Sequence, residues 1–215
     1  MQKPEENYDL EAYLSEYVET CPDKEIRILN AAINAFADKG FEATRTREIA
    51  ERAGIAEGTI FRYFPSKNAI LESMVPLLIR VLQPKIGKPI EDILNLNPDM
   101  PIDRILVAVL KDRLQMIRDN GRFIKSVLPS LIHRAPLLEQ LRVSLLPLIE
   151  GYVVQVVERG KAHGELDESV DARLVMPQLF GFVLAYSITQ SADLEREARD
   201  VEQFVESLMV GWRKR

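Results

Sequence analysis

Residues 54–67 read GIAEGTIFRYFPSK, with two glycines and a proline around a run of aromatic and β-branched residues. Gly54 is placed to take a positive φ in a turn, because glycine has no Cβ that would clash there. Ile60 and Phe64 are four residues apart, so they face the same side of a helix that ends before Pro65. The stretch therefore predicts a short helix that buries one side and presents the other outward.

Two more predicted helices precede this one. Residues 24–40 (KEIRILNAAINAFADKG) carry apolar side chains at three- and four-residue spacing, which indicates an amphipathic helix ended by Gly40. Residues 46–53 (TREIAERA) form a second, short helix with Ile49 on its inner side. Two short helices joined by a glycine-containing turn and braced by a longer helix make a helix-turn-helix.

The outward side of the third helix has the chemistry of a DNA-reading surface. A glycine at position 58 removes a side chain where the helix must lie close to another surface, and the major groove of DNA is such a surface. Thr59 and Arg62 can reach base edges or phosphates, and Lys67 can contact the backbone flanking the groove. We expect DNA contacts from Thr44, Arg45, Thr46, Arg47, Glu57, Gly58, Thr59, Arg62, Tyr63 and Lys67.

Charge is unevenly distributed in a chain whose net charge is −5. Residues 1–23 hold one lysine against seven acidic residues, and we treat them as an acidic N-terminal extension. Residues 24–67 hold eight lysines and arginines against six acids, so the predicted DNA-binding segment is locally positive. The extension has three interpretations that stay open: docking on a basic partner, repelling non-specific DNA, or covering the first predicted helix.

The segment GFEATRTREIAERAGIAEGTIFRYFPSKNAIL, residues 40–71, resembles the DNA-binding signature of the TetR family of bacterial transcription regulators. With the preceding helix the resemblance covers some 45 residues, and its glycines, aromatics and caps agree in register. The resemblance implies a dimer that binds DNA through the helix-turn-helix. It also implies a larger helical domain that binds an effector.

Four positions depart from the family pattern. Ala56 stands where Ser is usual, so the recognition helix loses a side-chain N-cap worth about 1 kcal/mol. Phe61 replaces a usual Tyr, and Arg45 replaces a second Thr. Glu57 brings a negative charge close to the expected DNA surface, where it either accepts from a cytosine amino group or points away. We expect DNA binding to survive these changes.

The rest of the chain is predicted to be helical as well. Ser66 is a good N-cap for a fourth helix to about residue 82, kinked at Pro76, before a connecting region broken by further prolines. Other helices are expected over 102–119, 122–133, 137–162, 171–190 and 195–213. The fold class is therefore all-α, with the acidic extension 1–23, a three-helix DNA-binding domain at 24–70 and a helical ligand-binding and dimerisation domain at 71–215.

Two helices of the larger domain are too apolar to be covered by one subunit. Residues 174–188 (LVMPQLFGFVLAYSI) are apolar nearly all the way round, so both sides of that helix need cover. We expect this helix and the last one to form a four-helix interface with a second copy, as the resemblance also implies. The predicted interface residues are Leu174, Phe182, Phe204, Leu208 and Trp212.

The resemblance further implies an effector pocket between residues 102 and 190. The candidate lining residues are Met116, Phe123, Leu131, Tyr152, Gln155, Gln178, Phe182 and Tyr186. The methionine and phenylalanines fit a plain hydrophobic core better than a ligand contact, and both alternatives stay open. The tyrosines and glutamines are more informative, because buried polar groups need hydrogen-bond partners.

Other classes of function lack their residues. We find no metal-ligand set, no Ser/His/Asp constellation and no glycine-rich phosphate loop, so we expect no enzyme, no metal and no cofactor. One cysteine and the lack of a secretory signal fit a reducing cytoplasm. Apolar stretches are interrupted well before membrane-spanning length, so we expect no membrane partner.

We therefore expect a cytoplasmic, dimeric transcription regulator. It would repress by binding a palindromic operator in double-stranded DNA, and a small, mostly apolar effector would release it. The alternative is a ligand-sensing co-regulator of the same architecture that binds a protein partner instead of DNA. The unusual Ala56, Glu57 and Phe61 and the acidic net charge keep that alternative open.

Overall fold

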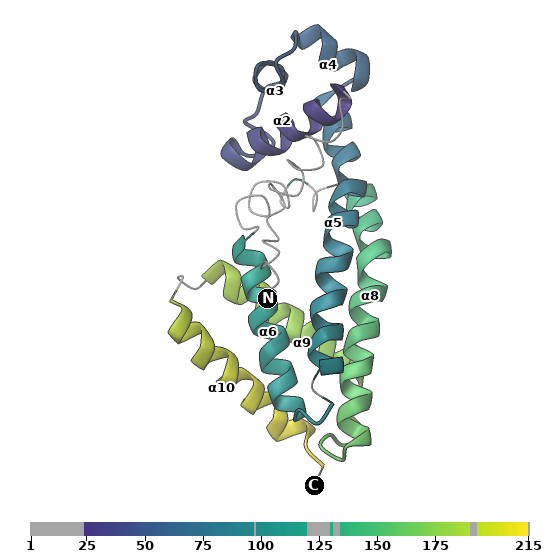
Figure 1. The fold of residues 1–215 in the computed structure, drawn as a ribbon, viewed down its shortest axis with the longest axis vertical. Coiled ribbons are helices and arrows are strands. Elements are labelled where there is room, and N and C mark those ends of the chain that lie inside the picture. The colour runs from purple at the N-terminus through teal and green to yellow at the C-terminus, as the bar shows by residue number, and fades with distance from the viewer. Residues whose placement is uncertain (1–23, 97, 120–129, 131–133, 190–192, 215) are drawn as a thin grey trace, which may run out of the picture. The chain divides into compact units, whose positions relative to one another are not determined.

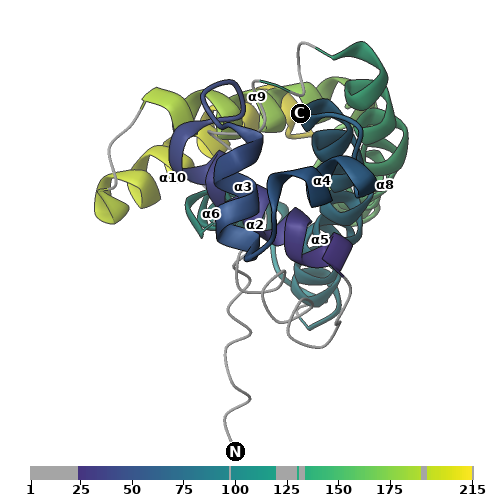
Figure 2. The same ribbon diagram turned by 90° about the horizontal axis from the view of Figure 1, so that it is seen from above.

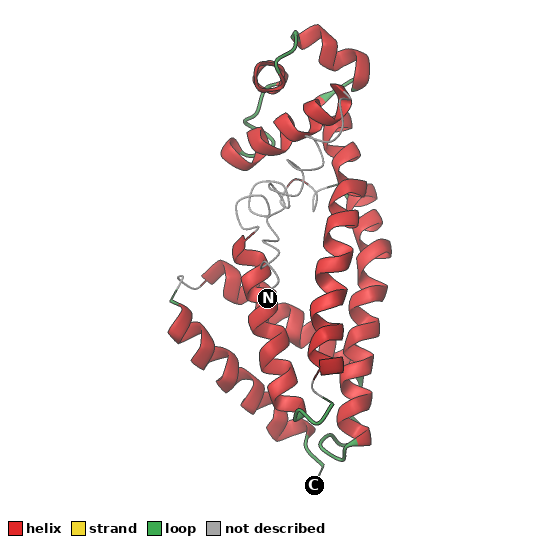
Figure 3. Ribbon diagram, in the orientation of Figure 1, coloured by secondary structure: helices red, strands yellow, loops and turns green. Residues whose placement is uncertain are grey.

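The computed structural model describes residues 24–96, 98–119, 130, 134–189 and 193–214. Its helices are α2 (Lys24–Lys39), α3 (Thr46–Ala53), α4 (Glu57–Tyr63), α5 (Lys67–Leu96), α6 (Ile102–Asp119), α8 (Ala135–Ala162), α9 (Ala172–Thr189) and α10 (Leu194–Trp212). Within these residues no strand is present, and one isolated bridge joins Leu166 to Arg213. Figure 3 shows the helices and their short loops, and the all-α prediction is confirmed. Apart from residue 130, the predicted helix 122–133 lies outside the described residues.

The chain forms two compact units. The first takes its described residues from 24–82 and 119–144, and the second takes its residues from 83–118 and 145–214. Helices α5 and α8 therefore contribute to both units. This division differs from a boundary at residue 70, because the start of α8 belongs to the same unit as the helix-turn-helix.

The core of the first unit explains why its three short elements fold together. Helices α2, α3 and α4 group with the first turns of α5 (Figure 1, Figure 2). Phe36 of α2 is fully buried and meets the Phe41 ring edge-on at 5.0 Å between centroids. Ile49 of α3 and Ile60 of α4 are also fully buried, and Phe64 is nearly so. The inward side predicted for α4 is confirmed.

Helix α5 is longer than the sequence predicted. We expected it to end near residue 82, but it continues to Leu96 through proline positions 84 and 89. A proline inside a helix removes one backbone hydrogen bond and costs about 3 kcal/mol in an exposed helix. Ile86 and Ile90 are buried, and this burial offsets the loss. Ser66 accepts from the Ala69 amide at 3.1 Å, so the predicted start of the helix is confirmed.

The second unit has its own apolar core between α6, α9, α10 and parts of α5 and α8. Ile105 of α6, Val157 of α8 and Val201 of α10 are almost completely buried in it. Arg159 donates to the carbonyls of Leu94 and Pro98, which ties α8 to the end of α5. By length and hydropathy α8 could cross a membrane; 22% of its apolar 18-residue window is buried, and Val157 is 1% exposed.

Candidate nucleic-acid interface

The turn between α3 and α4 has the geometry that the sequence predicted. Gly54 adopts φ 65° and ψ 39°, a left-handed conformation that strains any residue with a Cβ. The Ile55 amide donates to the Ala50 carbonyl at 3.0 Å and closes the end of α3. This turn fixes the direction in which α4 leaves α3.

Helix α4 begins without a side-chain cap. Ala56 precedes it in extended conformation, and its side chain has no acceptor for the first amides. The Glu57 carboxylate instead accepts a hydrogen bond from the Thr46 hydroxyl at 2.6 Å. Glu57 therefore binds α3, and the interpretation in which it points away from DNA describes its position in this structure.

Gly58 lies in α4 on the exposed surface of the first unit. An added Cβ at this position would meet no atom within 4 Å, and the backbone has ordinary helical geometry. Glycine inside a helix costs up to about 1 kcal/mol relative to alanine. Nothing in the described part of the chain explains this cost. The role predicted for Gly58, close approach to DNA, stays a prediction; Gly151, Gly181 and Gly211 have the same open space around them.

The surface around Gly58 carries cationic and aromatic groups. Arg62 is exposed, and its guanidinium lies 5.4 Å from the Tyr63 ring centroid. Arg45 is exposed just before α3, and Arg47 makes an exposed ion pair with Glu51 at 3.1 Å. Exposed ion pairs of this kind contribute little stability. Arg47 can therefore leave Glu51 and bind a DNA phosphate with little loss of free energy. Thr59 is half-buried on the same helix.

Two of the predicted DNA-contacting residues have internal partners instead. Thr44 is 2% exposed, and its hydroxyl donates to the Gly40 carbonyl at 2.8 Å. Lys67 donates to the carbonyls of Phe41, Glu42 and Thr44 at 2.7, 3.1 and 2.9 Å. An ammonium group has three donors, and all three are used. In this structure both side chains therefore have internal partners, and their contact with DNA stays a prediction.

Two residues at or beside this surface escaped the sequence analysis. Phe61 is 49% exposed on α4, although only its departure from the family pattern was noted. An unpaired aromatic on the outer side of the third helix was the available signal. Arg134 lies 4.7 Å from the Phe41 ring centroid although it is far away in sequence, and no local pattern indicates this contact.

The predicted effector-pocket residues that the structure describes belong to the second unit, and their side chains have different surroundings. Tyr152 is buried and donates to Glu91 of α5 at 2.6 Å, which raises the pKa of its phenol. Tyr186 donates to Asp200 of α10 at 3.0 Å. Gln155 and Gln178 are exposed, and the Gln178 amide donates to the Leu174 carbonyl at 2.7 Å. Met116 is half-buried, and Phe123 and Leu131 lie outside the described residues.

The predicted dimer residues divide in a similar way. Phe182 stacks on Phe204 at 4.1 Å between ring centroids, so these two rings are half-buried partners within one subunit. Leu174 is 66% exposed and remains available for a second copy. Leu208 and Trp212 are half-buried. Three exposed apolar residues on the same helices were not among those predicted from the sequence, namely Phe180, Leu184 and Val210.

Comparisons with known proteins identify the family of this chain. A family model described as bacterial regulatory proteins, tetR family, matches residues 28–74, which run from α2 into α5. An uncharacterized HTH-type transcriptional regulator of Mycobacterium bovis, Mb2274c, is 30% identical over 168 residues, which are 78% of this chain and 81% of that protein. The chain belongs to the TetR family. It is a transcription regulator with a DNA-binding helix-turn-helix, and the resemblance noted in the sequence is confirmed.

Other TetR-type relatives extend the match along the chain. The fatty acid metabolism regulator protein of Bacillus subtilis is 28% identical over 169 residues, which are 74% of this chain and 79% of that protein. The solved structure of the Bacillus subtilis regulator FadR in complex with stearoyl-CoA has a TM-score of 0.59 and 23% identity, and the match covers 84% of this chain and 96% of that one. A TetR-family regulator from Mesorhizobium loti has a TM-score of 0.66 at 16% identity, covering 89% and 97%. The two structures show the shared fold.

Proposed function

We propose that this TetR-family regulator is a homodimeric repressor that reads a palindromic operator with α4 and leaves it when a small, mostly apolar effector binds. Gly58 carries the proposal. It sits in open space on α4, beside the exposed Arg62, and the fold of the described residues does not require it. The major groove of DNA admits a helix, and a helix without a side chain at this point can approach base edges closely.

Apolar surface on the second unit supports the dimer. Leu174, Phe180 and Leu184 of α9 are 66%, 56% and 41% exposed, and Val210 of α10 is 86% exposed. Large apolar side chains gathered on one helix are typical of a surface that another protein covers. A two-fold dimer presents two copies of α4, which suits two half-sites about one DNA turn or a multiple of it apart.

Release from the operator would follow from a shift in the populations of two conformations of the dimer. An effector that binds better to a conformation with wrongly spaced α4 helices lowers operator affinity in proportion to that preference. A tenfold loss needs about 1.4 kcal/mol of differential binding. The relative named a fatty acid metabolism regulator supports an effector with a long apolar chain. We place this protein in the cytoplasm, where it would meet both DNA and effector.

A selection for bound genomic fragments tests the proposal. The full-length protein should enrich a palindrome at low salt. Gly58→Ala should bind the selected fragment at least tenfold more weakly, while its free energy of unfolding rises by up to about 1 kcal/mol. If no fragment is enriched at low salt, the protein-binding co-regulator becomes the better interpretation. If Gly58→Ala binds as tightly as the wild type, α4 is not the reading helix.

A further inference from the structure

Arg134 joins three segments of the first unit that are distant in sequence. It precedes α8, and its guanidinium donates to the Asn68 amide oxygen of α5 at 2.9 Å. The same guanidinium lies 4.7 Å from the Phe41 ring centroid and 3.9 Å from the Glu42 carboxylate. Phe41 and Glu42 belong to the turn of residues 40–45 between α2 and α3, which we call the α2–α3 turn.

The α2–α3 turn leads directly into the predicted phosphate-binding arginines. Lys67 holds the turn from one side with its three carbonyl bonds and lies 4.4 Å from the Phe41 ring centroid. Arg134 adds a second cation to the same ring. A cation near an aromatic ring contributes measurably when both are shielded from water. A residue outside the helix-turn-helix therefore contacts the turn that leads to Arg45.

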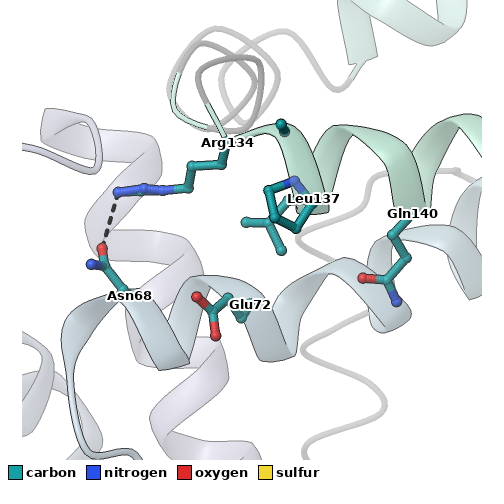
Figure 4. Close-up of a pocket in the computed structure, with 7 residues that line it drawn as sticks. Asn68, Glu72, Arg134, Leu137 and Gln140 are labelled. Carbon is teal, nitrogen blue, oxygen red and sulfur yellow. Dashed lines mark hydrogen bonds between the residues drawn. The ribbon is translucent and has the colours of Figure 1, made fainter.

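The contacts of Arg134 are incomplete. Its Nε is buried and makes no hydrogen bond with any described residue. Beside it lies an open hollow of about 690 Å³, lined by Asn68, Glu72, Arg134, Ala135, Pro136, Leu137 and Gln140. Figure 4 shows Arg134 reaching Asn68, with Glu72 further along α5. An unmade buried hydrogen bond costs free energy, so this position of Arg134 is held less firmly than a full set of bonds would hold it.

Glu72 offers Arg134 a second position. It is exposed, lines the same hollow, and makes no hydrogen bond or ion pair with any described residue. It follows Asn68 by four residues, which places it one turn, or about 6 Å, further along α5 on the same side. A carboxylate pairs with a guanidinium through two parallel hydrogen bonds, which the neutral amide of Asn68 cannot match.

We propose that Arg134 is a positioning residue with two partners one turn apart on α5. With Asn68 and Phe41 it holds the α2–α3 turn in place for DNA. With Glu72 it leaves the turn, and operator affinity falls. One-turn steps of one packed element past another are a known form of conformational switch. This inference rests on the proposed function, because it assigns the control of the same DNA-binding surface.

A double-mutant cycle in the full-length protein tests the proposal, with the selected genomic fragment as the probe. Arg134→Ala should bind the fragment about tenfold more weakly, equivalent to about 1.4 kcal/mol. Glu72→Gln should bind about threefold more tightly than the wild type, because it removes the competing partner. Removing a negative charge also reduces the long-range electrostatic repulsion between the protein and DNA. Glu72→Gln is therefore repeated in the Arg134→Ala background. The threefold gain should shrink to near zero there.

Two controls separate this mechanism from simple loss of structure. Arg142 pairs with Glu139 on α8, so Arg142→Ala removes an equal charge from the helix that Arg134 precedes and should change affinity by less than about twofold. Arg134→Lys should recover part of the affinity, because a lysine keeps the cation near Phe41. Urea unfolding of each variant reports its folded fraction, and affinities are corrected for it.

The outcomes are distinguishable from failure of the proposed function. If the wild type enriches no fragment, the proposed function fails before the cycle begins. If the wild type binds and Glu72→Gln has the same effect with and without Arg134, the two-partner proposal is overturned while the repressor proposal stands. If Arg134→Ala binds as tightly as the wild type, Arg134 does not position the turn.

Discussion

The Thr46 hydroxyl donates to the Glu57 carboxylate at 2.6 Å, which joins the first turn of α3 to the first turn of α4. Both helix starts are electropositive, because their first amides have no partner within the helix. A carboxylate between them is favoured electrostatically. The negative charge of Glu57, which is unexpected on a DNA-binding surface, thus stabilises the starts of α3 and α4.

We expect Glu57→Gln to separate stability from DNA binding. The amide keeps the shape but loses the charge, so the free energy of unfolding should fall by about 0.5–1.5 kcal/mol. Affinity for DNA should rise at the same time, because one negative charge near the phosphates is gone. Urea unfolding and a salt titration of DNA binding check both. Glu51→Gln, from the exposed pair with Arg47, is the matched control. If both stability and affinity fell, Glu57 would be a DNA ligand after all.

The structure predicts that Lys67 contributes to stability, whereas its position in the sequence predicts a contact with DNA. Its three donors bind carbonyls of the α2–α3 turn, so Lys67→Ala should cost about 1–3 kcal/mol of stability. The slope of log affinity against log salt should stay unchanged, because no phosphate contact is lost. A salt slope lowered by about one, with unchanged stability, would instead restore the phosphate contact expected from the sequence.

Arg62→Ala should change DNA binding and leave stability unchanged, which is the reverse of the effect expected for Lys67→Ala. Its guanidinium is exposed on α4 and contacts the neighbouring Tyr63 ring in the free protein. Arg62→Ala should therefore leave the free energy of unfolding within about 0.5 kcal/mol of the wild type. Its salt slope should fall by about one if Arg62 binds a phosphate, and its sequence preference should relax if it reads a base. Unchanged affinity for every sequence would remove Arg62 from the interface.

The helix-turn-helix was predictable because its signals are local. Gly54 marks a left-handed turn, Ser66 caps a helix, and Ile60 and Phe64 share one side, and each of these depends only on nearby residues. The roles of Lys67 and Arg134 were not predictable, because they depend on carbonyls and a ring brought close by folding. The length of α5 was missed for a related reason. Its prolines argue locally for a break, whereas burial of Ile86 and Ile90 is a property of the whole unit.

The packing of the second unit was also only partly predictable from the sequence. An apolar helix such as α9 indicates that both sides are covered, but its sequence does not say which side faces its own subunit. Phe182 lies against Phe204 of the same chain, whereas Phe180, two residues earlier, is 56% exposed. Only the packed structure distinguishes these two rings. The distinction moves the predicted dimer surface from Phe182 to Phe180.

The dimer can be tested at that position. Phe180→Ser should shift the sedimentation equilibrium from dimer to monomer at micromolar concentration, because an interface loses a large buried aromatic. Val154→Ser is the matched control, since Val154 of α8 is 46% exposed and lies outside the proposed interface. Phe182→Ser should lower stability as well, because it breaks the stack with Phe204. A Phe180→Ser protein that remains dimeric would place the interface elsewhere.

Tyr152 makes the stability of the second unit sensitive to alkaline pH. Its phenol donates to Glu91, and this bond together with burial raises its pKa above the ordinary value of 10.0. A group whose pKa is raised on folding stabilises the protein fully below its unfolded pKa, and that contribution is lost as pH rises through the folded value. Tyr152→Phe removes the bond at every pH. Urea unfolding should therefore show a deficit of about 1 kcal/mol for the variant at pH 8, and the deficit should shrink above pH 10. A deficit that stayed constant to pH 11 would mean that the hydrogen bond to Glu91 does not control the ionisation of Tyr152.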